Sequence, residues 1–121
     1  MNTPNKIPAL SIDPKWEVSP QQAKELLQSG RPFLLLDVRR PKEWQAAHIE
    51  GAKLIPLDQL AAGLAELSPW REAPVVVHCH HGVRSRQATA WLRQAGFMNV
   101  YSMAGGIDAW SMLIDPAVPR Y

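Results

Sequence analysis

The segment with the clearest chemical potential surrounds the one cysteine of the chain. It reads, in order, His78, Cys79, His80, His81, Gly82, Val83, Arg84 and Ser85. A cysteine thiolate is a nucleophile, and a nearby glycine permits the positive φ that a tight loop needs to curl around the sulfur. The segment therefore predicts a reactive Cys79 at the centre of a short loop.

The elements on either side of this loop give it a reason to bind negative charge. Residues 74–78 form a short β-branched run typical of a buried strand. An apolar face with helical spacing follows at Ala88, Trp91, Leu92 and Ala95. The first N–H groups of a helix lack internal partners, and the helix dipole adds partial positive charge there. We therefore expect amides to converge on the Cys79 sulfur and to stabilise a thiolate, a persulfide or an anionic sulfur donor.

Three other interpretations of this segment compete with that one. A lone cysteine at a strand end is often an inert core residue, although the glycine loop before a helix favours reactivity here. A metal site is disfavoured because four consecutive potential ligands do not converge easily on one tetrahedral ion. A cysteine phosphatase has a similar loop, but one residue longer than the four that separate Cys79 from Arg84. The shorter loop fits a single sulfur or a small oxyanion tip better than a phosphate.

Composition narrows the classes of function. The net charge of +2, from 13 basic and 11 acidic residues without a basic stripe, argues against nucleic-acid and anionic-membrane partners. One cysteine excludes an internal disulfide and fits a reducing compartment. No stretch has the length and apolarity of a signal peptide or a membrane span. We therefore expect a cytoplasmic protein of one domain, with no metal and no cofactor.

Strand and helix signals alternate along the chain. Ser19 and Pro20 predict a helix start and Gly30 its end. Further strands are expected at 33–38, 53–55, 74–78 and 99–102, and further helices at 41–47, 58–67, after the cysteine loop as far as Gly96, and at 107–113. This alternation predicts an α/β fold with a parallel sheet covered on both faces. Ligands of such sheets bind at the carboxyl ends of the strands, where Asp37 and Cys79 fall.

Three sequence blocks then carry a family resemblance. The first is Asp37-Val38-Arg39 with Glu43 and Trp44, followed by His48-Ile49-Glu50-Gly51-Ala52 and Pro56; the second is the Cys79 loop; the third is Gly105-Gly106-Ile107-Asp108-Ala109-Trp110. In this order and spacing they resemble the single-domain rhodanese family over positions 16–112. The resemblance implies a rhodanese-like fold, with a five-stranded parallel sheet flanked by helices on both faces. We expect the domain at 16–113, with tails at 1–15 and 114–121.

The resemblance also implies a function. Cys79 would accept a sulfane sulfur from thiosulfate or a persulfide and pass it to cyanide, a thiol or an acceptor protein. The loop residues would bind the donor: His80, His81, Gly82, Val83, Arg84 and Ser85. The family's thiosulfate enzymes carry basic residues just after the cysteine, where this chain has the partly charged His80 and His81. Two alternatives stay open, namely a non-catalytic module for partner binding or redox sensing and a small oxyanion enzyme.

The remaining candidate residues are expected to support the loop. Asp37, Arg39 and Glu43 are interpreted as an ion-pair network beneath it, and His48 as a hydrogen-bonded structural histidine. Arg84 has two equal interpretations, since its guanidinium suits either the bound anion or a carboxylate that ties the loop down. Ser85 is expected to cap the following helix, and donation to a persulfide is the alternative.

Overall fold

A sheet of five parallel strands forms the centre of the molecule in the computed structural model, which describes residues 16–121. The strand order is β1-β5-β4-β2-β3, and every neighbouring pair is parallel. The strands are β1 (Glu17–Val18), β2 (Leu34–Asp37), β3 (Lys53–Leu54), β4 (Val75–His78) and β5 (Val100–Met103). The predicted α/β fold with a five-stranded parallel sheet is therefore confirmed. The predicted tail at 1–15 lies outside the described residues.

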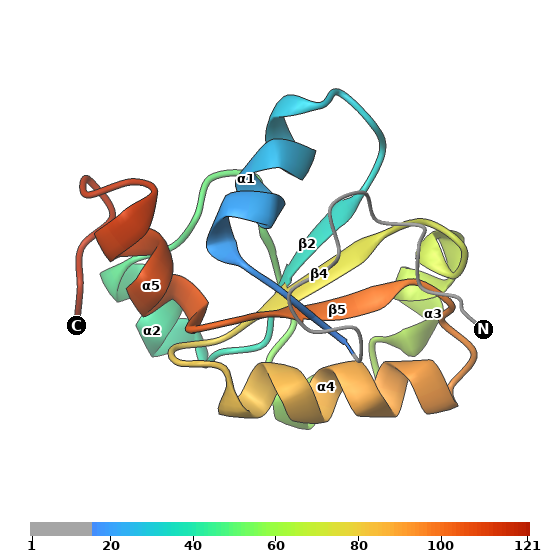
Figure 1. Cartoon of the computed structure of the whole chain (residues 1–121). Coiled ribbons are helices and arrows are strands. Elements are labelled where there is room, and N and C mark those ends of the chain that lie inside the picture. Colours follow the sequence, from blue (N-terminus) through green and yellow to red (C-terminus); the bar gives the residue numbers. More distant parts are fainter. Residues whose placement is uncertain (1–15) are drawn as a thin grey trace.

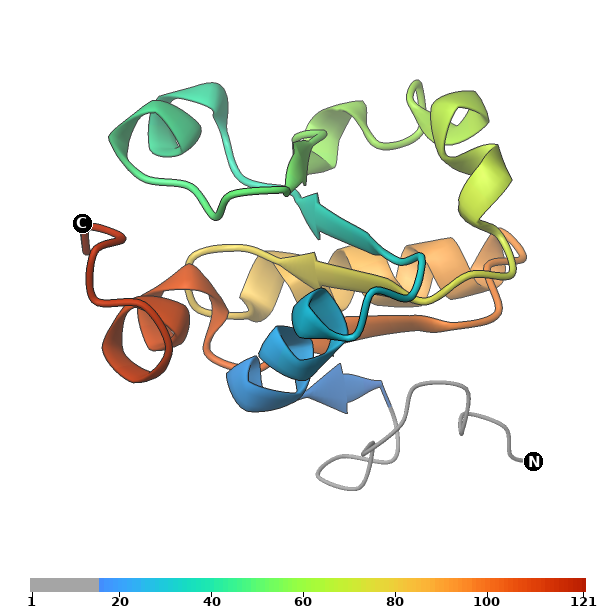
Figure 2. The ribbon, with the colours of Figure 1, turned by 90° about the horizontal axis from the view of Figure 1, so that it is seen from above.

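Helices cover both faces of this sheet (Figures 1 and 2). They are α1 (Pro20–Gln28), α2 (Pro41–Ala46), α3 (Leu64–Leu67), α4 (Val83–Gln94) and α5 (Gly106–Leu113), with short 3-10 turns at Leu57–Gln59 and Ser68–Trp70. Successive strand residues point to opposite faces, so the buried strands contribute to two cores. On one face Leu35, Val76 and Tyr101 pack with α1 and α5. On the other, Leu36 and Val77 pack with α4 and Leu67.

Local sequence signals explain where α1 begins and ends. The Ser19 hydroxyl accepts a bond from the Gln22 amide at 3.1 Å, and the Gln22 side chain accepts one from the Ser19 amide at 2.8 Å. Pro20 occupies the first helical position, where its missing N–H costs nothing. Gly30 follows the helix with a φ of 75°, a left-handed conformation that favours glycine. Both predicted boundaries are confirmed.

Two elements differ from the prediction. The single helix expected at 58–67 is instead a 3-10 turn, a further turn and the short α3, which begins after Gly63. Gly63 is a poor helix former, and a side chain there would press on Ile55 at 3.3 Å. The edge strand β1 was not predicted, because two residues are too short to show alternation. Within the described residues, no helix has the length and apolarity to cross a membrane.

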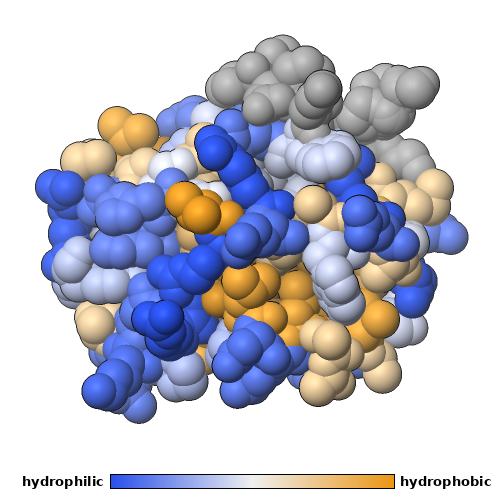
Figure 3. All heavy atoms as spheres, turned by 90° about the horizontal axis from the view of Figure 1, so that it is seen from below, coloured by the Kyte–Doolittle hydropathy of each residue, from blue (hydrophilic) through white to orange (hydrophobic). Residues whose placement is uncertain are grey.

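The face that carries α4 has exposed apolar side chains beside polar ones. Figure 3 shows this side as a group of hydrophobic atoms surrounded by hydrophilic ones. Val83, at the start of α4, is 67% exposed, and Trp91 further along the helix is 36% exposed. A surface pocket next to Arg84 includes Val38, Pro56 and Leu57 in its lining. The cysteine loop therefore leads into the first turn of α4 at the edge of a partly apolar surface.

Candidate active site

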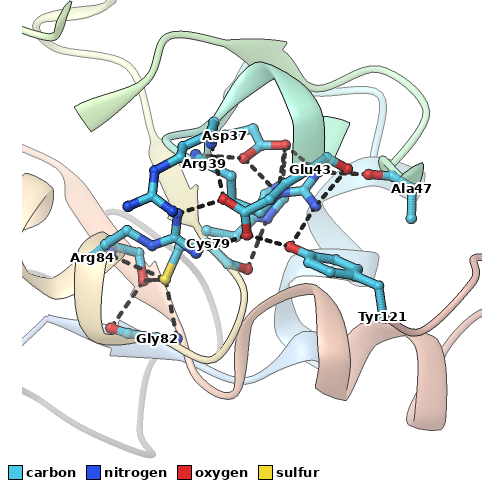
Figure 4. A network of polar contacts seen from close by, with 11 residues as sticks. Asp37, Arg39, Glu43, Ala47, Cys79, Gly82, Arg84 and Tyr121 are labelled. Carbon is cyan, nitrogen blue, oxygen red and sulfur yellow. Dashed lines mark hydrogen bonds and ion pairs between the residues drawn. The ribbon is translucent and has the colours of Figure 1, made fainter. Parts of the chain in front are cut away.

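The Cys79 loop connects the end of β4 to the start of α4, at the carboxyl edge of the sheet. Gly82 is the N-cap of α4 and has φ 117° and ψ −11°, a conformation that residues with a Cβ rarely adopt. This turn brings two backbone donors to the sulfur. The Gly82 and Ser85 amides lie 3.1 and 3.3 Å from Cys79 Sγ (Figure 4). The predicted convergence of helix-terminal amides on this sulfur is confirmed for these two.

Ser85 faces the sulfur instead of capping the helix. Its hydroxyl lies 3.5 Å from Cys79 Sγ, 2.7 Å from the Ser102 hydroxyl and 3.1 Å from the Gly82 carbonyl, to which it donates. The predicted cap at Ser85 is wrong, because Gly82 is the N-cap and the helix begins at Val83. Ser85 thus falls in the first turn, where helical side chains lean back toward the N-terminus. Its hydroxyl is placed to hydrogen-bond with Cys79.

Access to the sulfur is restricted. Cys79 is only 1% exposed and belongs to the core cluster on the α4 face. A nucleophile that reacts with an external donor needs an approach path, so the static structure shows a closed site. Any reaction at Cys79 therefore requires a neighbouring group to move.

Arg84 binds a carboxylate across the loop. Its Nη1 and Nη2 atoms donate to Glu43 Oε1 at 2.6 Å and Oε2 at 2.9 Å, a bidentate pair. These hydrogen bonds hold the pKa of the Glu43 carboxyl far below its ordinary value of 4.5. Of the two interpretations left open for Arg84, the structure adopts the one in which it ties the loop to a carboxylate. The guanidinium connects α4 with α2.

Asp37 and Arg39 form a separate buried pair. Arg39 Nη2 donates to Asp37 Oδ2 at 2.7 Å and to the Ala47 carbonyl at 2.7 Å, and both charged side chains are inaccessible to solvent. The direct hydrogen bond between Arg39 and Glu43 runs from Arg39 Nη1 to the backbone carbonyl of Glu43, at 3.3 Å, and not to the Glu43 carboxylate. The predicted network of three is therefore two pairs, Asp37 with Arg39 and Glu43 with Arg84. The carboxylate of Glu43 is drawn toward Arg84 because that guanidinium offers it two parallel donors.

Tyr121 joins the two pairs, and nothing in the sequence indicated it. Its hydroxyl accepts a bond from Arg39 Nη1 at 2.8 Å and donates to Glu43 Oε2 at 2.7 Å (Figure 4). Its ring stacks on His80 with centroids 4.0 Å apart and an angle of 9°. Burial raises the pKa of Tyr121 to about 12, which keeps the phenol neutral and able to donate. The residue is 82 positions from Arg39, too far for any local motif to reveal the contact.

His80 and His81 lie on the rim of the site with Asp108. Their rings stack at 3.9 Å, and one potential ligand atom from each of the three residues lies within 4.8 Å of the others. The Asp108 carboxylate is already held by Arg120, at 2.8 and 3.3 Å. Burial, and then the neighbouring His81, lowers the pKa of His80 below its ordinary 6.5. We therefore describe this cluster as a polar rim with a neutral His80.

The first turn of α5 holds the loop from the other side. The Ile107 amide donates to the Cys79 carbonyl at 2.8 Å, and the Asp108 amide donates to the His80 carbonyl at 3.2 Å. A Cβ at Gly106 would lie 2.4 Å from the His80 carbonyl oxygen and 2.5 Å from that of Cys79. Gly106 of the third block thus lets the backbone of α5 approach the backbone of the Cys79 loop closely.

His48 contacts Trp44 of α2 and not the Cys79 loop. Its Nδ1 lies 3.1 Å from the Trp44 carbonyl, and the two rings stack at 4.2 Å with an angle of 5°. The described contacts of His48 are with Trp44, and none joins it to the Cys79 loop.

Comparison with known proteins gives consistent matches. The family model of the rhodanese-like domain matches residues 19–113. The probable adenylyltransferase/sulfurtransferase MoeZ of Mycobacterium tuberculosis is 42% identical over 106 residues, covering 86% of this chain and 26% of its own length. The chain therefore spans about a quarter of that relative. The thiosulfate sulfurtransferase GlpE of Haemophilus influenzae is 37% identical over 94 residues, covering 78% of this chain and 86% of its own.

Solved structures agree with the sequence matches. A rhodanese-like domain protein from Staphylococcus aureus superposes with a TM-score of 0.74 at 25% identity, covering 88% of this chain and 98% of its own. The human single-domain sulfurtransferase TSTD1 gives a TM-score of 0.70 at 34% identity, with coverage of 80% and 96%. With its parallel sheet, its cysteine loop at the start of α4 and these matches, the chain belongs to the rhodanese-like domain family.

Proposed function

We propose that the protein is a rhodanese-type sulfurtransferase that carries a sulfane sulfur on Cys79. In the first half-reaction the Cys79 thiolate attacks the outer sulfur of a donor. With thiosulfate, a new S–S bond forms at Cys79 while the bond to the sulfonate sulfur breaks, and sulfite leaves with that electron pair. In the second half-reaction a thiophilic acceptor attacks the outer sulfur, and the electron pair of the S–S bond returns to Cys79 as thiolate.

One observation carries this proposal, namely the two amides directed at the sulfur. The Gly82 and Ser85 N–H groups lie 3.1 and 3.3 Å from Cys79 Sγ and belong to the start of α4. Backbone donors at a helix N-terminus favour negative charge, whether on a thiolate or on the outer sulfur of a persulfide. With thiosulfate as donor and cyanide as acceptor no proton donor or base is needed, because each half-reaction consumes one anion and releases another. A thiol acceptor reacts as its thiolate, after its proton has passed to solvent.

Both the sulfur donor and the sulfur acceptor are expected to come from outside the chain. The chain has one cysteine, so no second thiol of the same chain can resolve the persulfide. The acceptor is therefore cyanide, a small thiol or a cysteine of another protein. Because Arg84 is paired with Glu43, the donor relies on the loop amides and on His80, His81 and Val83 for recognition. A site that recognises its donor through amides and histidines, without a free guanidinium, suits a persulfide donor as well as thiosulfate.

The test is a matrix of donors and acceptors. Thiosulfate and glutathione persulfide would each be combined with cyanide and with a dithiol, using wild type, Cys79→Ser and the exposed-site control Met98→Ala. The proposal expects turnover with at least one combination in wild type and in the control, and none in Cys79→Ser. Equal rates in wild type and Cys79→Ser would refute it.

A non-catalytic module is the second candidate, and the 1% exposure of Cys79 favours it. In that case the closed loop would serve only as part of a binding surface. Wild type would then form no persulfide with any donor in the matrix, although it would remain folded.

A further inference from the structure

A pocket on the surface borders the Cys79 loop. Its volume is about 650 Å³, which lies within the range of pockets that hold small organic ligands. Val38 lines it and also belongs to the core cluster that contains Cys79. Arg84 lines it as well, and the next amide along the chain, that of Ser85, lies 3.3 Å from Cys79 Sγ. A ligand in this pocket would therefore lie beside the residues that surround the sulfur.

The pocket has charges of both signs. Arg40 and Lys42 are exposed, and no ion pair in the described part of the chain includes either of them. Asp58 is a third exposed charge in the lining and is likewise outside those ion pairs. Arg84 differs, because its charge is balanced by Glu43. Two cations and one carboxylate are thus available to a ligand.

The uncharged part of the lining is mainly apolar. It consists of Val38, Pro41, Pro56, Leu57 and one amide side chain, Gln59. Cations attract carboxylates, a carboxylate attracts an ammonium group, and apolar side chains accommodate methylene groups. An amino acid or a short peptide has all three features. Thiosulfate has neither an ammonium group nor a methylene group, so it would leave most of these lining groups unused.

We propose that this pocket binds the amino-acid part of a small persulfide, R–S–SH, and thereby places its sulfur beside Cys79. Arg40 and Lys42 bind the carboxylates of R, and Asp58 binds its ammonium group. Once neighbouring groups move aside, the Cys79 thiolate attacks the outer sulfur and forms a new S–S bond. The bond to the inner sulfur breaks, R–S⁻ leaves with that electron pair, and the proton stays on the outer sulfur. The donor assignment rests on the proposed sulfur transfer, whereas the binding of the amino-acid part does not.

S-methylglutathione tests the pocket without any reaction. It carries two carboxylates, one ammonium group and a thioether that cannot donate a sulfane sulfur. In an NMR titration, the backbone amide shifts of Leu57 and Asp58 in the pocket should change. The double variant Arg40→Gln/Lys42→Gln should weaken binding by about fivefold or more, through the loss of two exposed charge contacts.

The matched control is the double variant Lys24→Gln/Arg31→Gln. It also removes two positive charges, from a residue on α1 and one just after it, and neither residue lines the pocket. The control should bind S-methylglutathione as wild type does. Equal weakening in both double variants would overturn the proposal, because it would reflect net charge alone. A wild-type protein with no shift changes in the pocket would also overturn it.

Altered ligands test the individual contacts. The diethyl ester of S-methylglutathione lacks both carboxylate charges and should bind wild type about fivefold more weakly than the acid. An ester that binds wild type as tightly as the acid would overturn the role of Arg40 and Lys42. Asp58→Asn should weaken the binding of S-methylglutathione more than that of its N-acetyl derivative, which has no ammonium group. Equal effects on the two ligands would overturn the contact with Asp58.

Donor selectivity gives the second measurement. The ratio of kcat/KM for glutathione persulfide to that for thiosulfate should fall in Arg40→Gln/Lys42→Gln and stay near the wild-type value in Lys24→Gln/Arg31→Gln. An unchanged ratio in an active Arg40→Gln/Lys42→Gln variant would overturn the donor assignment. If S-methylglutathione binds as expected while wild type forms no persulfide with any donor, the proposed function fails and the binding site stands.

Discussion

Glu43 on α2 and Arg84 on α4 face each other beside the cysteine loop, joined by two hydrogen bonds of 2.6 and 2.9 Å. The pair joins two helices that follow different strands, because α2 follows β2 and α4 follows β4. It also occupies the one guanidinium of the loop, so backbone amides and not Arg84 supply the positive character next to the sulfur. The loop is therefore shaped by an internal ion pair before any donor arrives.

The first prediction concerns the stability of the protein in acid. The pKa of Glu43 lies below its ordinary 4.5 in the folded state, chiefly because of Arg84, so folding favours the charged form. The stabilisation is complete above pH 4.5 and is lost as the pH falls below that value toward the folded pKa. Glu43→Gln should lower the free energy of unfolding at pH 7 by about 2 kcal/mol, the typical scale of bonds to a charged group. Urea unfolding at a series of pH values measures both quantities.

The matched control for this prediction is Glu50→Gln, at an exposed position outside the network. It should leave the free energy of unfolding near the wild-type value. A Glu43→Gln variant that loses stability in acid as steeply as wild type would show that another carboxylate governs the transition.

The second prediction concerns Gly106. Alanine there would place its Cβ 2.4 Å from the His80 carbonyl oxygen and would also strain a φ of 61°. The matched control is Gly30→Ala, because Gly30 has a φ of 75° but no atom within 4 Å of the added Cβ. Gly30→Ala should cost about 1 kcal/mol from the strained φ alone, and Gly106→Ala clearly more. Equal losses in thermal unfolding would mean that the close approach of α5 to the loop is unimportant.

The third prediction concerns the hydroxyl of Ser85. Ser85→Ala removes the group 3.5 Å from the sulfur but keeps the amide at 3.3 Å. A sulfur anion can only accept, so the Ser85 hydroxyl must turn from the Gly82 carbonyl to donate to it. We expect loss of this hydrogen bond, of about 1 kcal/mol, to lower kcat by roughly fivefold. Ser102→Ala removes the partner of Ser85 at 2.7 Å without touching the sulfur. If the two variants lose the same activity, the hydroxyl of Ser85 acts only through packing.

The fourth prediction concerns His78, which is fully buried at the end of β4. Burial lowers the pKa of this histidine below its ordinary 6.5, so the folded state keeps it neutral. Below pH 6.5 the unfolded chain binds a proton that the folded chain does not, and the free energy of unfolding falls by up to about 1.4 kcal/mol per pH unit for each such histidine. Chemical unfolding between pH 7 and pH 5 should show a steeper fall in wild type than in His78→Gln. An identical slope in both would contradict the neutral assignment.

The parts of the fold that the sequence predicted are those with strong local signals. Leu34–Asp37 and Val75–His78 are apolar runs, and Ser19 with Pro20 marks a helix start, so short-range physics identifies them. The site was predicted as far as it depends on a contiguous segment, as in the turn at Gly82 and the amides around Cys79.

Contacts between segments distant in the chain could not be predicted from the sequence. Whether Arg84 binds an anion or a carboxylate depends on where α2 lies relative to α4, and spacing does not reveal that. Tyr121 reaches Glu43 across 78 positions through a segment with no helix or strand pattern. Such contacts follow from tertiary packing alone, which also buries Cys79 more deeply than a reactive loop suggested.

The most direct test of the central claim is the intact mass of the protein after treatment with thiosulfate or glutathione persulfide. The account predicts a gain of one sulfur atom, located on Cys79 by peptide mapping, that disappears on addition of cyanide and is absent in Cys79→Ser. A folded wild-type protein whose mass stays unchanged with every donor, or whose added sulfur cyanide does not remove, would contradict it.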